Sequence, residues 1–347
     1  MTADFIDYTD IRWNAVLDTM SHDVYHLPAY AHLSATEHKG GKARAFYASD
    51  GNNSCLIPLV TRPIPSALEA PSEWLDVISP YGYASPLLTR DGVWMSDAIK
   101  QFVRCCAENN IVSVFLRLHP FFDAGNGWSR QGDLVLHGQI VYVDLTASTD
   151  EIMSRMKAEH RTDIRKLLRL GFTTAVDDWT LLEDFVQLYR DTMYRLGADQ
   201  YYLFPREYFD TLRKELGSAV HLISVRSPAG VLAAAGLYTS VGGIAQAHLG
   251  GSADEFRRVA PSKLMQYAAI EWAKTDGCRI LNLGGGLDCK ADLLFRFKAA
   301  FSPLRRDFST VRIVCDPCRY DALVAKSRRA QSSPGVAGGF FPAYRAR

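Results

Sequence analysis

Apolar and polar positions along the chain divide it into two blocks of mixed helices and strands. In the first block, apolar residues recur at the helical period in three segments, and short apolar or alternating runs predict three strands. The expected helices are 11–20, 30–36 and 92–109, and the expected strands are 43–48, 54–60 and 112–118.

The second block repeats this theme at greater length. A strand at 139–145 precedes a helix that Ser148 or Thr149 can cap, and we expect this helix to run to Leu170 and to stop at Gly171. Further helices are expected at 180–196, 205–216, 261–275 and 293–300, and further strands at 172–176, 221–225, 231–239, 244–249, 280–283 and 309–314.

This order of elements predicts the α+β fold class with two units. The predicted units are residues 1–138 and 139–314, each near the usual size of a domain. They are followed by a C-terminal segment, 315–347, whose last part is basic and contains Ser-Ser-Pro-Gly and Gly-Gly. Such a composition is typical of a mobile tail.

Composition and charge exclude several classes of protein. The 347 residues contain 39 Lys and Arg against 38 Asp and Glu, so no overall field directs the chain to nucleic acid or membranes. The first ten residues carry three Asp and no base, unlike a signal peptide. The longest stretch without a charged residue, 227–253, is interrupted by Gly242-Gly243. We therefore expect a cytoplasmic protein with no stable insertion into a membrane.

Several familiar catalytic motifs are missing from the sequence. It contains no G-x-S-x-G nucleophile elbow, no H-E-x-x-H zinc motif, no Walker loop and no G-x-G-x-x-G. The nine histidines include no pair at metal-ligand spacing on one helix. We expect no metal site, and hydrolase, zinc peptidase, kinase and dehydrogenase functions are disfavoured.

A basic stripe follows the helix expected after residue 148. Four cations lie four residues apart and so stay on one side of the helix: Lys157, Arg161, Arg165 and Arg169. One interpretation is a solvated face on which Glu159 and Asp163 pair with these cations. The other is a surface that contacts phosphates of RNA or of a phosphorylated ligand. His160 falls at the edge of the apolar face, where a packed histidine is expected.

A glycine triplet, Gly284, Gly285 and Gly286, ends a buried strand. It is either a tight turn or a site wall where a ligand lies against backbone, because glycine permits close approach and unusual dihedral angles. Lys298 follows on a short apolar helix, beside Phe297. It is either an exposed lysine or a fixed positive charge suited to a developing oxyanion.

Two loops crowd aromatic and charged residues together. One contains Asp76 and Tyr81, and the other contains Tyr202 and Arg206. Such loops are either binding walls or turns supported by core aromatics.

The order of motifs in the second block resembles the Fem-type aminoacyltransferases and the related acetyltransferase-like domains of the GNAT superfamily. The motifs, spread over 139–312, are Arg-Leu-Gly-Phe, Tyr-Tyr-Leu-Phe-Pro-Arg-Glu-Tyr-Phe, Ala-His-Leu-Gly-Gly-Ser, Pro-Ser-Lys-Leu-Met, Leu-Asn-Leu-Gly-Gly-Gly and Leu-Phe-Arg-Phe-Lys-Ala-Ala-Phe. The first block matches more loosely, through Ser-Pro-Tyr-Gly-Tyr and Arg-Leu-His-Pro. The resemblance implies two tandem GNAT-like units with a cleft between them.

The resemblance also implies a reaction: transfer of an amino acid from aminoacyl-tRNA to an amine, without metal. The Phe-Lys pair of the family is matched by Phe297 and Lys298. Substrate-cleft residues are matched less securely by Tyr202 and Arg206, and an acidic residue by Asp76. Further binding residues are expected within the shared motifs, at Tyr81, His248 and Lys263.

The donor can also be judged from residues 257–263. Acetyl-CoA enzymes of the superfamily hold pyrophosphate on a glycine-rich turn before a helix. This chain has no glycine there, and Pro261 removes one N–H. A standard CoA site is disfavoured, although Ser262 and Lys263 could still meet a phosphate.

Three functions follow. The first is aminoacyl transfer from charged tRNA, with no tightly bound cofactor. In it Lys298 stabilises the oxyanion or holds the RNA terminus, Asp76 or a tyrosine such as Tyr202 accepts a proton, and the basic stripe contacts phosphates. The second is acetyl-CoA-dependent N-acetylation of an amino sugar or small amine. The third is an inactive member that binds a glycan or peptide.

The expected partners follow from the first function. They are charged tRNA and an amine-bearing small molecule or cell-envelope precursor. We expect a bacterial protein that is a monomer or a weak dimer.

Overall fold

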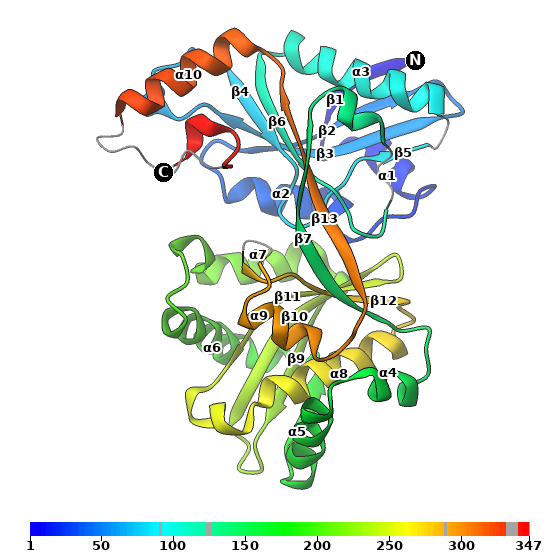
Figure 1. The fold of residues 1–347 in the computed structure, drawn as a ribbon, viewed down its shortest axis with the longest axis vertical. Helices are drawn as coiled ribbons and strands as arrows, with labels where there is room; N and C mark the ends of the chain where they lie inside the picture. Colours follow the sequence, from blue (N-terminus) through cyan, green and yellow to red (C-terminus); the bar gives the residue numbers. More distant parts are fainter. Residues whose placement is uncertain (90–91, 123–125, 288–289, 331–338, 347) are drawn as a thin grey trace. The chain divides into compact units, whose positions relative to one another are not determined.

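The computed structural model describes residues 1–89, 92–122, 126–287, 290–330 and 339–346 (Figure 1). The chain folds into two compact units. The first consists of Met1–His137 together with Asp307–Arg347, and the second consists of Gly138–Arg306. The second unit is therefore inserted between two segments of the first.

The strands of the first unit follow the order β1-β2-β3-β4-β6-β13, with β5 paired to β3. The β4 and β6 strands run parallel, and the other neighbours run antiparallel. The strands are β1 (Thr2–Asp7), β2 (Lys42–Ser49), β3 (Ser54–Pro63), β4 (Leu75–Ile78), β5 (Leu87–Leu88), β6 (Ile111–Arg117) and β13 (Arg305–Val314).

Helices cover this strand set with apolar faces. Trp13 and its neighbours on α1 and α2 form one core with the strands, and Phe102 on α3 forms another with Trp128. The helices are α1 (Ile11–Leu17), α2 (Pro28–Thr36), α3 (Gly92–Glu108) and α10 (Pro317–Ala330).

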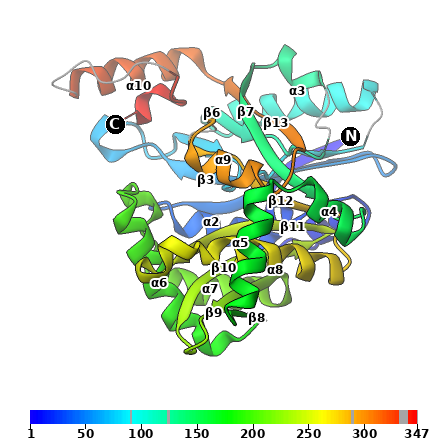
Figure 2. The same cartoon turned by 60° about the horizontal axis from the view of Figure 1, so that its bottom comes forward.

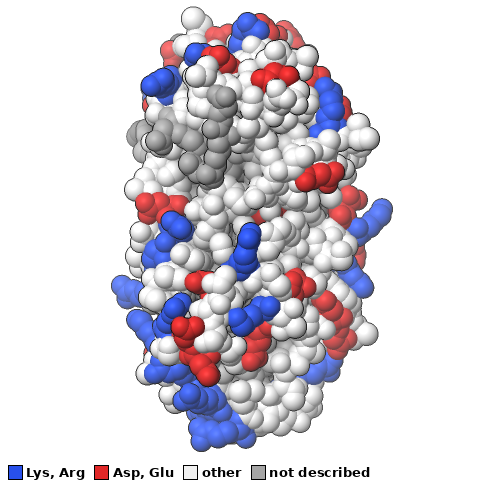
Figure 3. All heavy atoms as spheres, turned by 90° about the vertical axis from the view of Figure 1, so that its right-hand side faces the viewer, with Lys and Arg blue, Asp and Glu red and all other residues white. Residues whose placement is uncertain are grey.

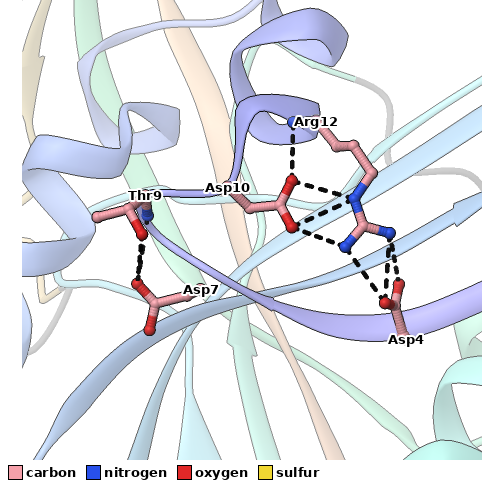
Figure 4. A network of polar contacts seen from close by, with 5 residues as sticks. All are labelled: Asp4, Asp7, Thr9, Asp10 and Arg12. Atoms are coloured by element: carbon pink, nitrogen blue, oxygen red, sulfur yellow. Dashed lines mark hydrogen bonds and ion pairs between the residues drawn. The ribbon is translucent and has the colours of Figure 1, made fainter.

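Acidic residues near the N-terminus organise the start of α1 (Figure 4). Asp10 is the N-cap and accepts the backbone N–H of Arg12 at 2.9 Å. The Arg12 guanidinium then bridges Asp10 and Asp4, at 2.6 and 3.2 Å. This capping lowers the pKa of Asp10, chiefly through the hydrogen bonds from Arg12.

The strands of the second unit follow the order β7-β12-β11-β10-β9-β8. Its strands are β7 (Asp133–Asp144), which starts in the first unit, β8 (Thr173–Val176), β9 (Val220–Arg226), β10 (Leu232–Val241), β11 (Ile244–Ser252) and β12 (Ile280–Gly284). Its helices are α4 (Thr149–Arg155), α5 (Ala158–Arg169), α6 (Leu182–Arg195), α7 (Arg206–Leu216), α8 (Pro261–Thr275) and α9 (Leu293–Ala299).

Two helix layers sandwich the second strand set. On one face, α8 packs on the strands and α5 crosses α8 (Figure 2), and their apolar residues share one core. On the other face, α6 and α7 pack Phe185, Tyr189 and Phe209 against one another. No helix among the described residues is long and apolar enough to cross a membrane.

One expected helix is divided in two. The capping box of Ser148 and Glu151 starts α4 as the sequence indicates, but α4 ends at Arg155. Met156 and Lys157 are extended, and Lys157 donates its backbone N–H to Ala300 at 2.8 Å. A tertiary hydrogen bond thus replaces the intrahelical one, and the single helix to Leu170 was a wrong prediction.

The C-terminal segment also differs from the expected tail. Residues from Pro317 to Ala330 form α10, and Tyr344 is buried among Ile64, Leu68, Val112 and Leu323. The Tyr344 hydroxyl bonds to Ser113 at 2.8 Å. The Ser-Ser-Pro-Gly stretch lies outside the described residues. The segment is thus part of the first unit, because its aromatic and apolar residues complete a core.

We expect substitution of Tyr344 by alanine to destabilise the protein strongly. Tyr344 is 3% exposed, whereas Phe340 in the same segment is 59% exposed. Loss of a buried aromatic side chain costs about 3–5 kcal/mol. Urea unfolding of Tyr344→Ala should show this loss, and Phe340→Ala should stay within about 0.5 kcal/mol of the parent. Equal stability of the two variants would contradict the packing.

Candidate functional site

The second unit contains an abrupt end of strand pairing. The β11 and β12 strands pair in parallel only from Ile244 and Ile280 to Gln246 and Asn282. Beyond this point β11 continues to Ser252 along β10, while β12 continues along β7. His248 is the extra residue of a bulge in β11, since Ala247 and Leu249 oppose consecutive residues of β10.

The glycine triplet begins where β12 ends. Gly284 has φ +76° and donates its N–H to Asn282 Oδ1 at 2.9 Å. A Cβ at Gly286 would collide with the backbone oxygen of Lys290. These two positions therefore require glycine, as the sequence indicates.

Lys298 is fixed onto this glycine loop. It lies on α9, and its Nζ donates to the carbonyl oxygen of Gly285 at 2.6 Å. The side chain is partly buried, so the ammonium is held at the end of β12 rather than extended into solvent. The structure thus brings together Lys298 and the three glycines, which sequence analysis singled out separately.

Aromatic rings pack around α9, the helix that carries Lys298. The Phe297 ring lies 5.5 Å from the ring of His160 and 5.3 Å from that of Phe301. His160 is buried against these rings, as expected for a packed histidine. Burial, and then the positive charge of Lys263, lower the pKa of His160, so the ring packs as a neutral group.

His248 has a partner that the sequence did not reveal. Its Nε2 lies 2.9 Å from the Tyr208 hydroxyl, which comes from α7. Burial lowers the pKa of His248 from 6.5 to about 4, so the imidazole is neutral at pH 7. Tyr208 lies within the Tyr-Tyr-Leu-Phe-Pro-Arg-Glu-Tyr-Phe motif, but its place on the apolar face of a helix is equally common for aromatic core residues.

Lys263 does not face an open phosphate site. It is buried on α8 and bonds to Asp163 at 2.5 Å and to Glu159 at 2.8 Å. Burial opposes its charge, but these two carboxylates prevail and raise its pKa. Its charge is thus paired with two carboxylates of α5, and phosphate binding by Lys263 stays a prediction.

The turn before α8 also lacks the features of a pyrophosphate cradle. Its N-cap, Ala260, offers no side-chain cap, and Pro261 follows at the first helical position. The Ala260 N–H is directed back to the carbonyl groups of Phe256 and Arg257.

Arg206 and Tyr202 have structural roles in the second unit. Arg206 pairs with Glu183 at 2.7 Å and with Asp210 at 2.6 Å, which ties α7 to α6. The carbonyl of Tyr202 accepts the Tyr189 hydroxyl at 2.8 Å. Two carboxylates thus hold the guanidinium of Arg206, and its role in substrate binding stays a prediction.

Asp76 and Tyr81 lie in the first unit. Asp76 is fully buried, and its carboxylate accepts from Arg62 at 2.7 Å, Arg345 at 2.6 Å and Tyr344 at 3.1 Å. Its carboxylate is thus engaged by three donors of the first unit, and the role of Asp76 as a base stays a prediction. Tyr81 is exposed beside the guanidinium of Arg117.

The basic stripe is only partly available for phosphates. Lys157 is the exposed N-cap of α5, and Arg161 donates to the carbonyls of Ser154 and Met156 across the helix break. Arg165 and Arg169 are exposed. Lys and Arg side chains gather at the end of the molecule where Figure 1 places α5 (Figure 3).

No group of three His, Cys, Asp or Glu among the described residues is arranged to hold a metal ion.

A family model matches part of the second unit. Residues 154–298 match the family model Acetyltransf_6, described as an acetyltransferase (GNAT) domain. The matched range starts before α5 and ends at Lys298. No curated protein matches the chain in sequence.

Solved structures extend the likeness to the whole fold. A crystal structure of FemX covers 89% of this chain and 97% of its own, with a TM-score of 0.69 at 14% identity. The structure of L-PGS from Bacillus licheniformis covers 92% and 97%, with a TM-score of 0.57 at 15% identity. A C-terminal domain from Agrobacterium fabrum, described as part of a putative lysylphosphatidylglycerol synthetase, covers 94% and 98%, with a TM-score of 0.56 at 15% identity.

These findings define the class of protein. The chain is an acyltransferase with a GNAT domain. Its fold is that of FemX, which confirms the α+β, Fem-like architecture expected from the order of motifs.

We expect His248 to make stability depend on pH. Its folded pKa of about 4 is below the ordinary 6.5, so the unfolded chain binds the proton more readily. Stability is then complete above about pH 6.5 and falls as pH drops toward 4. At about pH 5 the loss reaches about 2 kcal/mol. Urea unfolding at about pH 7.5 and about pH 5 should show a smaller difference for His248→Gln than for the parent protein. If the parent protein and His248→Gln lost equal stability between the two pH values, the pH dependence would not come from His248.

Proposed function

We propose that this protein transfers an aminoacyl group from aminoacyl-tRNA to the amine of a small molecule or cell-envelope precursor. The observation that carries the proposal is the position of Lys298. Its ammonium is fixed on the Gly285 carbonyl, at the point where β11 and β12 stop pairing. A fixed cation beside exposed backbone suits a reaction in which negative charge develops on an acyl oxygen.

The chemistry requires few groups from the protein. The amine nitrogen attacks the ester carbonyl of the donor, and the carbonyl oxygen becomes an oxyanion that Lys298 stabilises. Collapse breaks the ester C–O bond and forms the amide, and the amine proton passes to the leaving hydroxyl. His248, neutral at pH 7, can relay that proton through water. Much of the rate comes from positioning the two substrates.

Three further observations favour a tRNA donor. The turn at Ala260 and Pro261 lacks the free N–H groups that hold the pyrophosphate of CoA. The exposed cations of α5 offer contacts to an RNA backbone. One structural neighbour is described as a lysylphosphatidylglycerol synthetase, and the product in that name carries a lysyl group, which is an aminoacyl group.

Acetyl transfer from acetyl-CoA is the second candidate. It is favoured by the family model, which is described as an acetyltransferase domain. The two candidates share Lys298 and differ in the donor. They are therefore separated by donor binding rather than by a test of Lys298.

We expect Lys298→Met to lower transfer by about 10²–10³-fold, the usual loss when one donor to an oxyanion is removed. The assay follows radiolabelled amino acids from a charged tRNA pool to a panel of amines. Arg296→Met is the matched control, because Arg296 is an exposed cation on the same helix. Unchanged unfolding of both variants in urea would show that the fold is intact. Full activity of Lys298→Met would contradict the role.

We expect charged tRNA to bind with an affinity that weakens steeply with salt, and acetyl-CoA to give no calorimetric signal. Replacing Arg165, Lys166 and Arg169 together by glutamine should flatten the salt slope by about 2, roughly 0.7–0.9 per lost phosphate contact. The control is the double variant Lys100→Gln and Arg104→Gln on α3 of the first unit. Saturable binding of acetyl-CoA without tRNA binding would select the second candidate.

A further inference from the structure

The first unit has a face with an excess of arginine, which we name the arginine face. It contains Arg62 on β3, Arg117 on β6, Arg312 on β13 and Arg345 in the C-terminal segment. Asp76 is the carboxylate that pairs with Arg62 and Arg345. The arginine face is separate from the glycine loop and Lys298, which belong to the second unit.

Strand register places these side chains on one side of the sheet. Arg62 lies opposite Asp76, and Asp76 lies opposite Ser113. Successive side chains of a strand alternate between faces, so Phe115 and Arg117 share the face of Ser113. Arg312 lies directly opposite Phe115 and so shares it too.

The C-terminal segment completes this face. Arg345 reaches Asp76 with Nε and the Pro63 carbonyl with Nη2. Phe341 stacks on Phe115, with ring centroids 6.3 Å apart, and lies under the guanidinium of Arg312.

Two arginines of this face, Arg62 and Arg345, share one carboxylate within the described residues. Asp76 neutralises one positive charge and uses both of its carboxylate oxygens. The Arg62 side chain, 11% exposed, uses only Nε in hydrogen bonds within the described chain, so its two terminal nitrogens remain as donors. Arg312 pairs with no acid there, and its Nε is buried without a hydrogen-bond partner. Partly buried guanidinium groups without counter-charges are costly, which indicates that an anion supplies the missing charge.

Burial, together with the positive charge of the arginine face, lowers the pKa values of two nearby histidines, His38 and His137. Burial, and then Arg62, Arg345 and Arg117, lower the pKa of His38 to about 4, and Asp76 opposes this only weakly. Burial, and then Arg312 and Arg117, lower the pKa of His137. All four arginines therefore act on neighbouring groups in the same sense, and both histidines remain neutral at pH 7.

We propose that the arginine face binds a phosphoryl group, either a phosphate or a pyrophosphate, carried by a ligand of this protein. Guanidinium forks match phosphate oxygens in pairs, and a dianion suits a site that lacks more than one counter-charge. Arg345 gives the C-terminal segment a direct part in this site. The inference stands on the first unit alone and does not depend on the acyl donor or on Lys298.

The test is calorimetric titration of the full chain with sodium pyrophosphate and with inorganic phosphate at low salt. Saturable binding is expected, tighter for pyrophosphate. Arg312→Gln and Arg117→Gln are each expected to weaken it about tenfold or more, as for loss of one charge-assisted contact. Neither residue bonds to Asp76, so both variants should fold, and urea unfolding verifies this. Arg104→Gln on α3, an exposed arginine of the same unit, should bind like the parent protein.

Binding that requires both Arg312 and Arg117 supports the arginine face as the phosphoryl site. Absence of saturable binding, or binding that Arg312→Gln and Arg117→Gln leave unchanged, overturns the proposal. Where binding holds, competition by vesicles of phosphatidylglycerol against vesicles of phosphatidylcholine shows whether the phosphoryl group comes from a lipid or from a soluble ligand. Failure of aminoacyl transfer leaves pyrophosphate binding unaffected, so the two proposals fail independently.

Discussion

The candidate active site depends on a parallel ladder that is only three residue pairs long. Parallel pairing of β11 and β12 holds Gln246 beside Asn282, and each strand then follows a different neighbour. The β12 strand continues along β7 as far as Gly284, and the next residue, Gly285, uses its carbonyl to accept the ammonium of Lys298. The packing of Phe297 against His160 and Phe301 then fixes α9, so the cation has one position.

Several charged residues that stand out in the sequence form salt bridges within their own unit. Lys263, Arg206 and Asp76 each looked functional in sequence, and each is held by two opposite charges. Such pairs fix helices and strands relative to one another within a unit. The charges of the paired side chains are then engaged by their partners. Lys298 is held at the end of β12 by the bond of its Nζ to the Gly285 carbonyl.

Local signals in the sequence predicted most elements, and long-range contacts explain the failures. Hydrophobic periodicity located α3 and α8, and the need for glycine at Gly284 followed from its position after a buried strand. The β4 strand escaped detection because a buried aspartate interrupts its apolar pattern. That aspartate is paired with Arg62 and with Arg345, which are distant in sequence. The break between α4 and α5 depends on the carbonyl of Ala300, which no local pattern records. The Phe297-Lys298 pair was recognisable, but its glycine partner was not.

The division of the first unit by the second has a consequence for synthesis on the ribosome. The second unit occupies one continuous stretch, Gly138–Arg306, and all of its strands except the start of β7 are complete within it. The first unit needs β13, α10 and Tyr344, which emerge last. More than two-thirds of the chain must therefore be synthesised after Asp76 before its partner Arg345 is available. The second unit can form while translation continues, whereas the unit synthesised first is the one finished last. A chain cut short near its end would carry a folded second unit beside an unfinished first one.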